Sequence, residues 1–137
     1  MIDISINGCI IKAFKTNNYD ALVHGCNCFC TWGAGLAVKM SKNFPGSFKA
    51  DQSTIYGDKS KLGSYSFSET KNGVIINAYT QYKYGGGRNN ADLEAIKKVF
   101  EKINEDFSGK VICIPKIGAG LAGGNWKEIK KVINSVT

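Results

Sequence analysis

The stretch VHGCNCFCTWGAGLAVKM, residues 23–40, decides the fold. Together with the two residues before it, its start is a β-like run of small and branched residues, and a turn-prone middle follows. Its end places Leu36, Ala37 and Met40 at helical spacing after a Gly-Ala-Gly turn. We therefore predict a strand at 21–26, a glycine-rich loop, and a helix at 35–43 that Pro45 closes.

The same order of elements recurs near the C-terminus around PKIGAGLAGGNW, residues 115–126. An apolar strand is expected at 110–115, a second glycine loop at 117–124, and a final helix marked by Ile129, Val132, Ile133 and Val136. Two strand, loop and helix units predict a sheet that is at least partly parallel and covered on both faces. Ligands of such sheets bind beyond the carboxyl ends of the strands.

The rest of the chain adds elements of both kinds. Strands are predicted at 2–6, 64–69 and 74–79, the last two joined as a hairpin by the turn at 71–73. A short helix is predicted at 48–56. A longer helix, capped by Asn90, places Leu93, Ile96, Phe100 and Ile103 on one face together with Phe107. With 137 residues, we expect one α/β domain over 1–137.

Composition narrows the class of protein. Hydrophobic residues make up 43% of the chain, and no segment approaches the roughly 18 apolar residues that span a bilayer, so we expect no membrane association. An odd number of cysteines, five, argues against a disulfide framework and favours reduced thiols in a cytoplasmic protein. The net charge of +7 favours anionic partners, or is an ordinary solvated basic surface.

Cysteine and histidine give little support to a metal site. Cys26, Cys28 and Cys30 form one cluster, whereas zinc sites usually have two separated pairs of ligands, and His24 is the single histidine. We expect these thiols to be small buried hydrophobic groups, and we expect neither a metal nor a cofactor.

Both glycine loops have the character of phosphate-binding loops. Each leads to a helix N-terminus, where free backbone N–H groups and the positive end of the helix dipole attract anions. Glycine lets a phosphate approach the amides without meeting a Cβ, so the two loops together suit a diphosphate. Their spacing matches neither a Walker nor a dinucleotide fingerprint.

The two quoted stretches resemble the macrodomain family over nearly the whole chain. The similarity is closest to the yeast-type ADP-ribose 1″-phosphate phosphatases, which carry a similar His-x-Cys-Asn-Cys-x-x-x-Trp-Gly-x-Gly run. This resemblance implies a three-layer α/β/α sandwich with a mixed central sheet, and ADP-ribose or ADP-ribose 1″-phosphate as the ligand.

The resemblance also implies where the ligand lies. Residues 8–10 are expected near the adenine. Residues 25–27 and 33–38 are expected to line the distal ribose and the diphosphate, residues 80–81 to flank the distal ribose, and residues 117–123 to close over the phosphates. The implied binding residues are Gly8, Cys9 and Ile10; Gly25, Cys26 and Asn27; Gly33, Ala34, Gly35, Leu36, Ala37 and Val38; Thr80 and Gln81; and Ile117, Gly118, Ala119, Gly120, Leu121, Ala122 and Gly123.

His24 and Asn27 are the candidate catalytic residues. An imidazole of near-neutral pKa attacks phosphorus or shuttles a proton, and the alternative for His24 is a buried, hydrogen-bonded structural role. Asn27 is expected to orient the distal ribose, and its alternative is a simple Asx turn. Strand alternation puts His24 on the same face as Leu22 and Cys26, opposite Val23.

Three functions remain open. The first is hydrolysis of the terminal phosphate of ADP-ribose 1″-phosphate. The second is removal of ADP-ribose from protein or nucleic acid, with Lys83 in reserve, although that subgroup's loop aspartate is Ala122 here. The third is a reader that binds without turnover. In the macrodomain pattern, a Gly-Asp pair follows the first strand and its carboxylate holds the adenine amino group, whereas this chain has Gly8-Cys9 there.

We expect a monomer, and nucleic-acid binding only as an added property.

Overall fold

A central sheet of five strands organises the protein. In this computed structural model, residues 2–3, 10–32, 36–83, 91–115 and 126–137 are described. The strand order is β1-β5-β2-β4-β3, where β1–β5, β5–β2 and β2–β4 pair in parallel and β4–β3 antiparallel. The predicted mixed sheet is confirmed. The strands are β1 Ile2–Asp3, β2 Ala21–Cys26, β3 Tyr65–Thr70, β4 Gly73–Tyr79 and β5 Ile112–Cys113.

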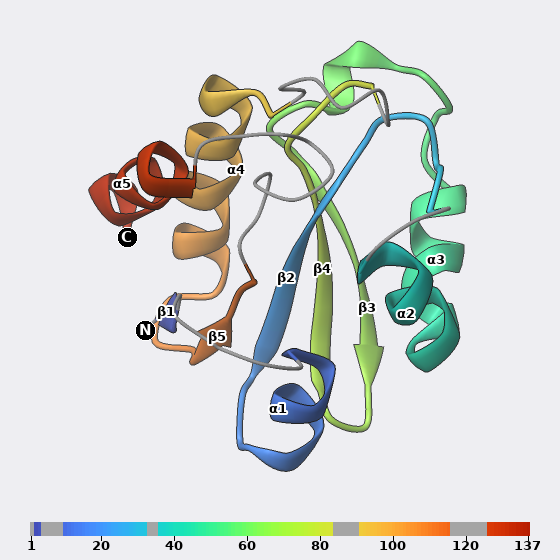
Figure 1. Ribbon diagram of the computed structural model, residues 1–137, viewed down its shortest axis with the longest axis vertical. Helices are drawn as coiled ribbons and strands as arrows, with labels where there is room; N and C mark the ends of the chain where they lie inside the picture. The colour runs from blue at the N-terminus through green and yellow to red at the C-terminus, as the bar shows by residue number, and fades with distance from the viewer. Residues whose placement is uncertain (1, 4–9, 33–35, 84–90, 116–125) are drawn as a thin grey trace.

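Helices cover both faces of this sheet, as Figure 1 shows, so the predicted three-layer sandwich is confirmed. Helices α4 and α5 cover one face, and α1, α2 and α3 cover the other. None of the helices in the described ranges combines the length and the apolar character needed to cross a bilayer. The helices are α1 Ile10–Thr16, α2 Leu36–Asn43, α3 Pro45–Gln52, the 3-10 helix η1 Lys59–Lys61, α4 Leu93–Asp106 and α5 Trp126–Val136.

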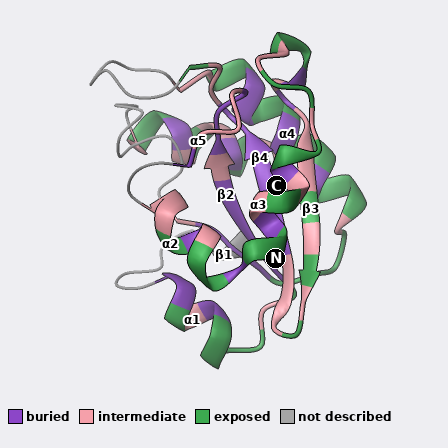
Figure 2. Cartoon of the chain, turned by 90° about the vertical axis from the view of Figure 1, so that its right-hand side faces the viewer, coloured by how far each residue is buried: buried purple, intermediate pink, exposed green. Residues whose placement is uncertain are grey.

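The core divides at the sheet because side chains of a strand alternate between its faces. Val23 packs with Ile96, Phe100 and other side chains of α4 and α5, whereas Leu22 packs with Phe14 of α1 and Met40 of α2. Figure 2 shows this buried band along the sheet. The predicted alternation along β2 is therefore confirmed.

Several boundaries differ from the predictions. Pro45 begins α3 because a proline at the first helical position loses no internal hydrogen bond, so the helix starts before 48. Asp92, not Asn90, caps α4, and its side chain accepts a hydrogen bond from the Ala95 N–H at 3.0 Å. Helix α1 was not predicted at all.

Candidate functional site

The carboxyl ends of β2 and β4 lie side by side and form the base of the candidate site. Cys26 and Tyr79 are paired in register, and the Thr80 N–H donates to the Cys26 carbonyl at 3.2 Å. Asn27 and Thr80, the first residues beyond the two strands, are both buried. The structure thus brings together five predicted site residues: Gly25, Cys26, Asn27, Thr80 and Gln81.

The other predicted residues divide into two groups. Ile10, Leu36 and Ala37 pack in the same apolar cluster as Cys26, and Val38 is half-buried on α2. The following predicted residues lie outside the described part of the chain: Gly8, Cys9, Gly33, Ala34, Gly35, Ile117, Gly118, Ala119, Gly120, Leu121, Ala122 and Gly123.

Asn27 holds the loop after β2 through an Asx turn. Its Oδ1 accepts from the N–H of Phe29 at 2.8 Å and of Thr31 at 3.4 Å, and its Nδ2 donates to the Thr31 carbonyl at 2.8 Å. The amide group of an asparagine has two N–H donors. Among the described residues, the second N–H of the Asn27 amide has no acceptor, so it can donate to a ligand.

Thr80 places a hydroxyl at the end of β4 that has no hydrogen-bond partner among the described residues. The residue is fully buried, while its carbonyl accepts from the Asp92 N–H at 2.8 Å. A buried hydroxyl without a partner costs about 1–3 kcal/mol, so an acceptor or donor supplied by a ligand is favourable here.

A row of polar side chains crosses the sheet beneath this edge. His24, Asn77 and Ser66 are register partners on β2, β4 and β3, so their side chains meet on one face. Asn77 Nδ2 donates to the Ser47 carbonyl at 2.9 Å and to Ser66 Oγ at 3.0 Å, which leaves its Oδ1 as acceptor. The His24 Nε2 lies 2.7 Å from that oxygen and is therefore the protonated ring nitrogen.

Burial keeps the His24 imidazole neutral. Only 2% of the residue is exposed, and desolvation lowers its pKa to about 4, although the bond to Asn77 and the charge of Asp51 oppose this shift. Above His24, the Trp32 ring packs edge-on with ring centroids 4.9 Å apart. His24 thus supports the loop that follows its own strand.

Asp51 of α3 ends the polar row and anchors that loop. Tyr79 OH donates to its Oδ1 at 2.6 Å, and Trp32 Nε1 donates to its Oδ2 at 2.7 Å. The phenol has one proton, so Ser66 is the donor in its 2.8 Å contact with Tyr79. His24 donates to Asn77, Asn77 to Ser66, Ser66 to Tyr79 and Tyr79 to Asp51, so this series of hydrogen bonds runs in one direction. Burial and the bond to Asp51 raise the pKa of Tyr79 well above its ordinary value.

The thiols of Cys26 and Cys28 are neutral at ordinary pH. Burial raises the pKa of Cys28 to about 11 and that of Cys26 well above its usual value. Cys30 has a positive φ of 51° and lies 3.9 Å from the amine of Lys61, a buried lysine that donates to Thr54 Oγ1 at 2.9 Å. Within the described residues, no group of three His, Cys, Asp or Glu side chains is placed to hold a metal ion.

The sequence reading missed Asp51, Asn77, Ser66 and Lys61. Asn77 carried a signal, because it is the polar residue within the otherwise apolar run of β4. Asp51 carried none, since an acidic residue near the end of a short helix is ordinary. Lys83, the reserve candidate, is exposed, and its carbonyl accepts from Gln81 Nε2 at 2.8 Å.

Comparison with known proteins gives consistent matches. The family model described as Macro domain matches residues 23–133. An uncharacterized 17.5 kDa protein from the tk-vs intergenic region of Enterobacteria phage T4 is 36% identical, covering 98% of this chain and 90% of that protein. An ADP-ribose 1″-phosphate phosphatase of Debaryomyces hansenii is 30% identical, covering 81% of this chain and 79% of that protein. The solved structure of Thermosipho africanus DarTG in complex with ADP-ribose is 18% identical with a TM-score of 0.71, covering 87% of this chain and 35% of that one.

Proposed function

The chain belongs to the macrodomain family, and on that premise we propose that it binds ADP-ribose and removes the terminal phosphate of ADP-ribose 1″-phosphate. The reaction is supported by the name of the relative from Debaryomyces hansenii. The binding is supported by the complex of the structurally similar Thermosipho africanus protein with ADP-ribose.

One observation of this structure carries the proposal: at one sheet edge lie the buried Thr80 hydroxyl and an Asn27 amide proton, neither of which has a partner among the described residues. Both groups follow the carboxyl ends of parallel strands, where ligands of such sheets bind. A ribose offers hydroxyl groups that both donate and accept, which suits this pair. The distal ribose is therefore the part of the ligand that we assign to this edge.

In the proposed reaction, the oxygen of water attacks phosphorus and the bond between phosphorus and the C1″ oxygen breaks. The products are inorganic phosphate and ADP-ribose with a free hydroxyl group. Asn27 would hold the distal ribose so that the phosphate lies in line with the attacking water, which is catalysis by positioning.

The catalytic assignment of His24 stays a prediction, and its surroundings favour the structural alternative. Nucleophilic attack requires a ring nitrogen that is free to reach the substrate, whereas the Nε2 proton of His24 is committed to Asn77 and Nδ1 lies 3.9 Å from the Cys26 thiol. We propose that His24 is a positioning residue that acts through Trp32 on the loop above it.

A glycohydrolase remains the second candidate because Lys83 is exposed two residues beyond Gln81. In that reaction, water would attack the distal ribose carbon and release ADP-ribose from protein or nucleic acid. A reader that binds without turnover is the third candidate.

Phosphate release from ADP-ribose 1″-phosphate, measured with a chelator present, tests the proposal. We expect turnover in the wild type, a roughly 100-fold loss of kcat/KM in Asn27→Ala, and no change in the matched control Asn104→Ala on the exposed side of α4. ADP-ribose binding is measured in parallel by calorimetry. Binding without turnover would identify a reader, and Lys83-dependent release of ADP-ribose from a modified protein would identify a glycohydrolase.

A further inference from the structure

Exposed apolar side chains gather where three loops meet. Ile55 is 71% and Tyr56 68% exposed, and the Tyr56 ring packs edge-on against Phe29 with centroids 5.4 Å apart. Phe29 in turn packs against Tyr82 at 4.8 Å. We call these four residues, Ile55, Tyr56, Phe29 and Tyr82, the aromatic platform. Neighbouring exposed apolar side chains add no stability to the folded protein and are typical of interaction sites.

Hydrogen bonds fix the three loops to one another. The Gly57 N–H donates to the Cys28 carbonyl at 2.7 Å, the Cys28 N–H donates to the Tyr82 carbonyl at 3.1 Å, and Tyr82 OH donates to the Gly57 carbonyl at 2.9 Å. The loops that carry the rings are therefore held together before any partner arrives. A preformed surface loses little conformational entropy on binding.

The platform adjoins the proposed ADP-ribose site. Phe29 lies two residues beyond Asn27, and Tyr82 directly follows Gln81. The segment between α3 and β3, which carries Ile55 and Tyr56, lies at the upper end of the molecule in Figure 1, where β2 and β4 end.

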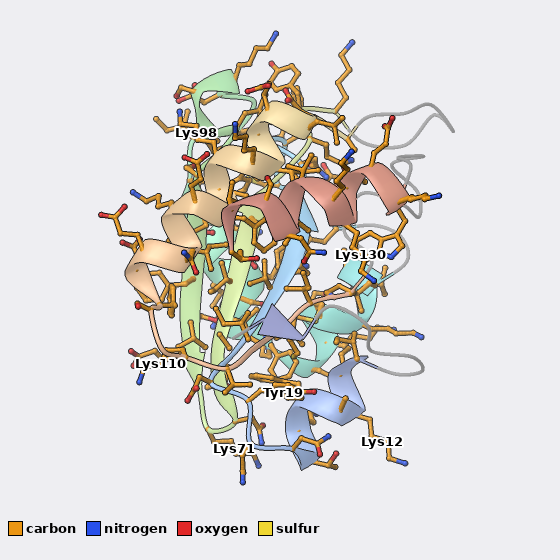
Figure 3. All side chains as sticks on the ribbon, turned by 90° about the vertical axis from the view of Figure 1, so that its left-hand side faces the viewer. Lys12, Tyr19, Lys71, Lys98, Lys110 and Lys130 are labelled. Atoms are coloured by element: carbon orange, nitrogen blue, oxygen red, sulfur yellow. The ribbon has the colours of Figure 1, made fainter. Side chains whose placement is uncertain are left out.

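Positive charge accompanies these rings. Lys59 Nζ lies 5.6 Å from the centroid of the Tyr82 ring, and Lys83 is exposed next to Tyr82. The acidic residues near this end of the sheet are Asp58, Asp51, which is buried, and Asp92, whose N–H donates to the Thr80 carbonyl. The net charge of the chain is +7. The lysines labelled in Figure 3 come from α1, the β3–β4 turn, α4, α5 and the segment before β5, so they are spread over several elements. A net positive charge attracts polyanions to the surface in general and does not by itself fix where they bind.

We propose that the aromatic platform binds unpaired bases of single-stranded nucleic acid. A base stacks on the exposed Tyr56 ring beside Ile55, and the neighbouring phosphates lie near Lys59 and Lys83. Every base has a π-face, so this mode requires unstacked bases and no particular sequence. Paired bases of a duplex do not present that face. The proposal goes beyond the hydrolysis of ADP-ribose 1″-phosphate, and it does not depend on that activity.

Fluorescence anisotropy with fluorescein-labelled oligonucleotides of about 12 residues tests it, since single-strand sites span about 4–16 nucleotides. Oligothymidylate and oligouridylate are compared with a duplex of the same length at low salt, without ADP-ribose. We expect both single strands to bind more tightly than the duplex. Tyr56→Ala should weaken single-strand binding roughly 5- to 100-fold, and Tyr56→Phe should retain it because the ring remains.

Phe67→Ala is the matched control, because Phe67 of β3 is another exposed aromatic residue, 53% exposed, outside the platform. Unchanged thermal unfolding of Tyr56→Ala establishes that the fold is retained. Equal binding of duplex and single strands, or equal losses in Tyr56→Ala and Phe67→Ala, would overturn the proposal. So would a Tyr56→Ala variant that loses ADP-ribose binding and keeps oligonucleotide binding, because the platform would then belong to the nucleotide site.

Discussion

Asp51 is the residue whose replacement should damage the site region most. The carboxylate is fully buried and accepts from Trp32 Nε1 at 2.7 Å and from Tyr79 OH at 2.6 Å. Asp51→Ala removes both acceptors and leaves two buried donors unpaired. A hydrogen bond to a charged group contributes about 1.5–3 kcal/mol, so we expect a loss of about 3–5 kcal/mol. That is a large part of the roughly 5–15 kcal/mol that stabilises a domain.

Asp51→Asn should cost much less. The amide oxygen still accepts from Trp32, and the amide nitrogen donates to Tyr79 if the Ser66–Tyr79 bond reverses its direction. One hydroxyl proton, that of Ser66, then lacks its present acceptor. We expect a loss of about 1–2 kcal/mol for this variant.

Urea unfolding followed by circular dichroism measures these differences. With a slope of about 2 kcal/mol per M, Asp51→Ala should lower the midpoint by about 2 M. Asp106→Ala is the matched control, because Asp106 also accepts from a tyrosine, Tyr65 OH at 2.6 Å, but at the surface. A midpoint of Asp51→Ala within about 0.5 M of the wild type, or an equal loss in Asp106→Ala, would refute the reasoning.

Two further predictions concern pH and backbone geometry. Because the pKa of His24 falls from 6.5 in the unfolded chain to about 4 in the folded protein, the unfolded chain binds more protons between these values, and stability decreases as pH falls. From about pH 7 to pH 5 the wild type should lose about 2 kcal/mol more than His24→Gln in urea titrations, and parallel pH profiles would contradict this. Gly73→Ala should cost at least about 2 kcal/mol in the same assay, since its φ is +135° and a Cβ would lie 2.7 Å from the Asp20 carbonyl oxygen. Gly109→Ala, at φ +78° with open space around it, should cost only about 1 kcal/mol, and equal losses would disprove the steric argument.

The sequence predicts the central strands of the sheet well because it carries that information locally. The alternation in β2 assigns Leu22 and Val23 to opposite faces, and the hairpin turn at Gly73 sets the pairing of β3 with β4. Helix α1 was missed because three buried residues, Ile10, Ile11 and Phe14, are too few for a clear helical period.

The polar row could not be predicted, because it depends on register between distant strands. His24 and Asn77 are 53 residues apart, and only the parallel pairing of β2 with β4 makes them partners. Asp51 comes from a helix on top of that sheet face, and its contacts with Trp32 and Tyr79 need the tertiary packing of three segments. Patterns of hydrophobicity carry no information about such contacts.

The direction of the hydrogen bonds bears on how the site works. Each donor from His24 to Tyr79 is committed to the next acceptor, and the chain of bonds ends on Asp51. Among the described residues, a proton placed on His24 Nδ1 would meet the Cys26 thiol at 3.9 Å, which is a weak acceptor. Proton transfer through His24 is therefore costly at neutral pH. Its packing against Trp32, which supports the loop, requires no change of protonation. For the proposed hydrolysis, these hydrogen bonds favour a mechanism in which the protein positions the substrate. The loss of kcat/KM in Asn27→Ala is therefore more informative than the loss in a His24 variant.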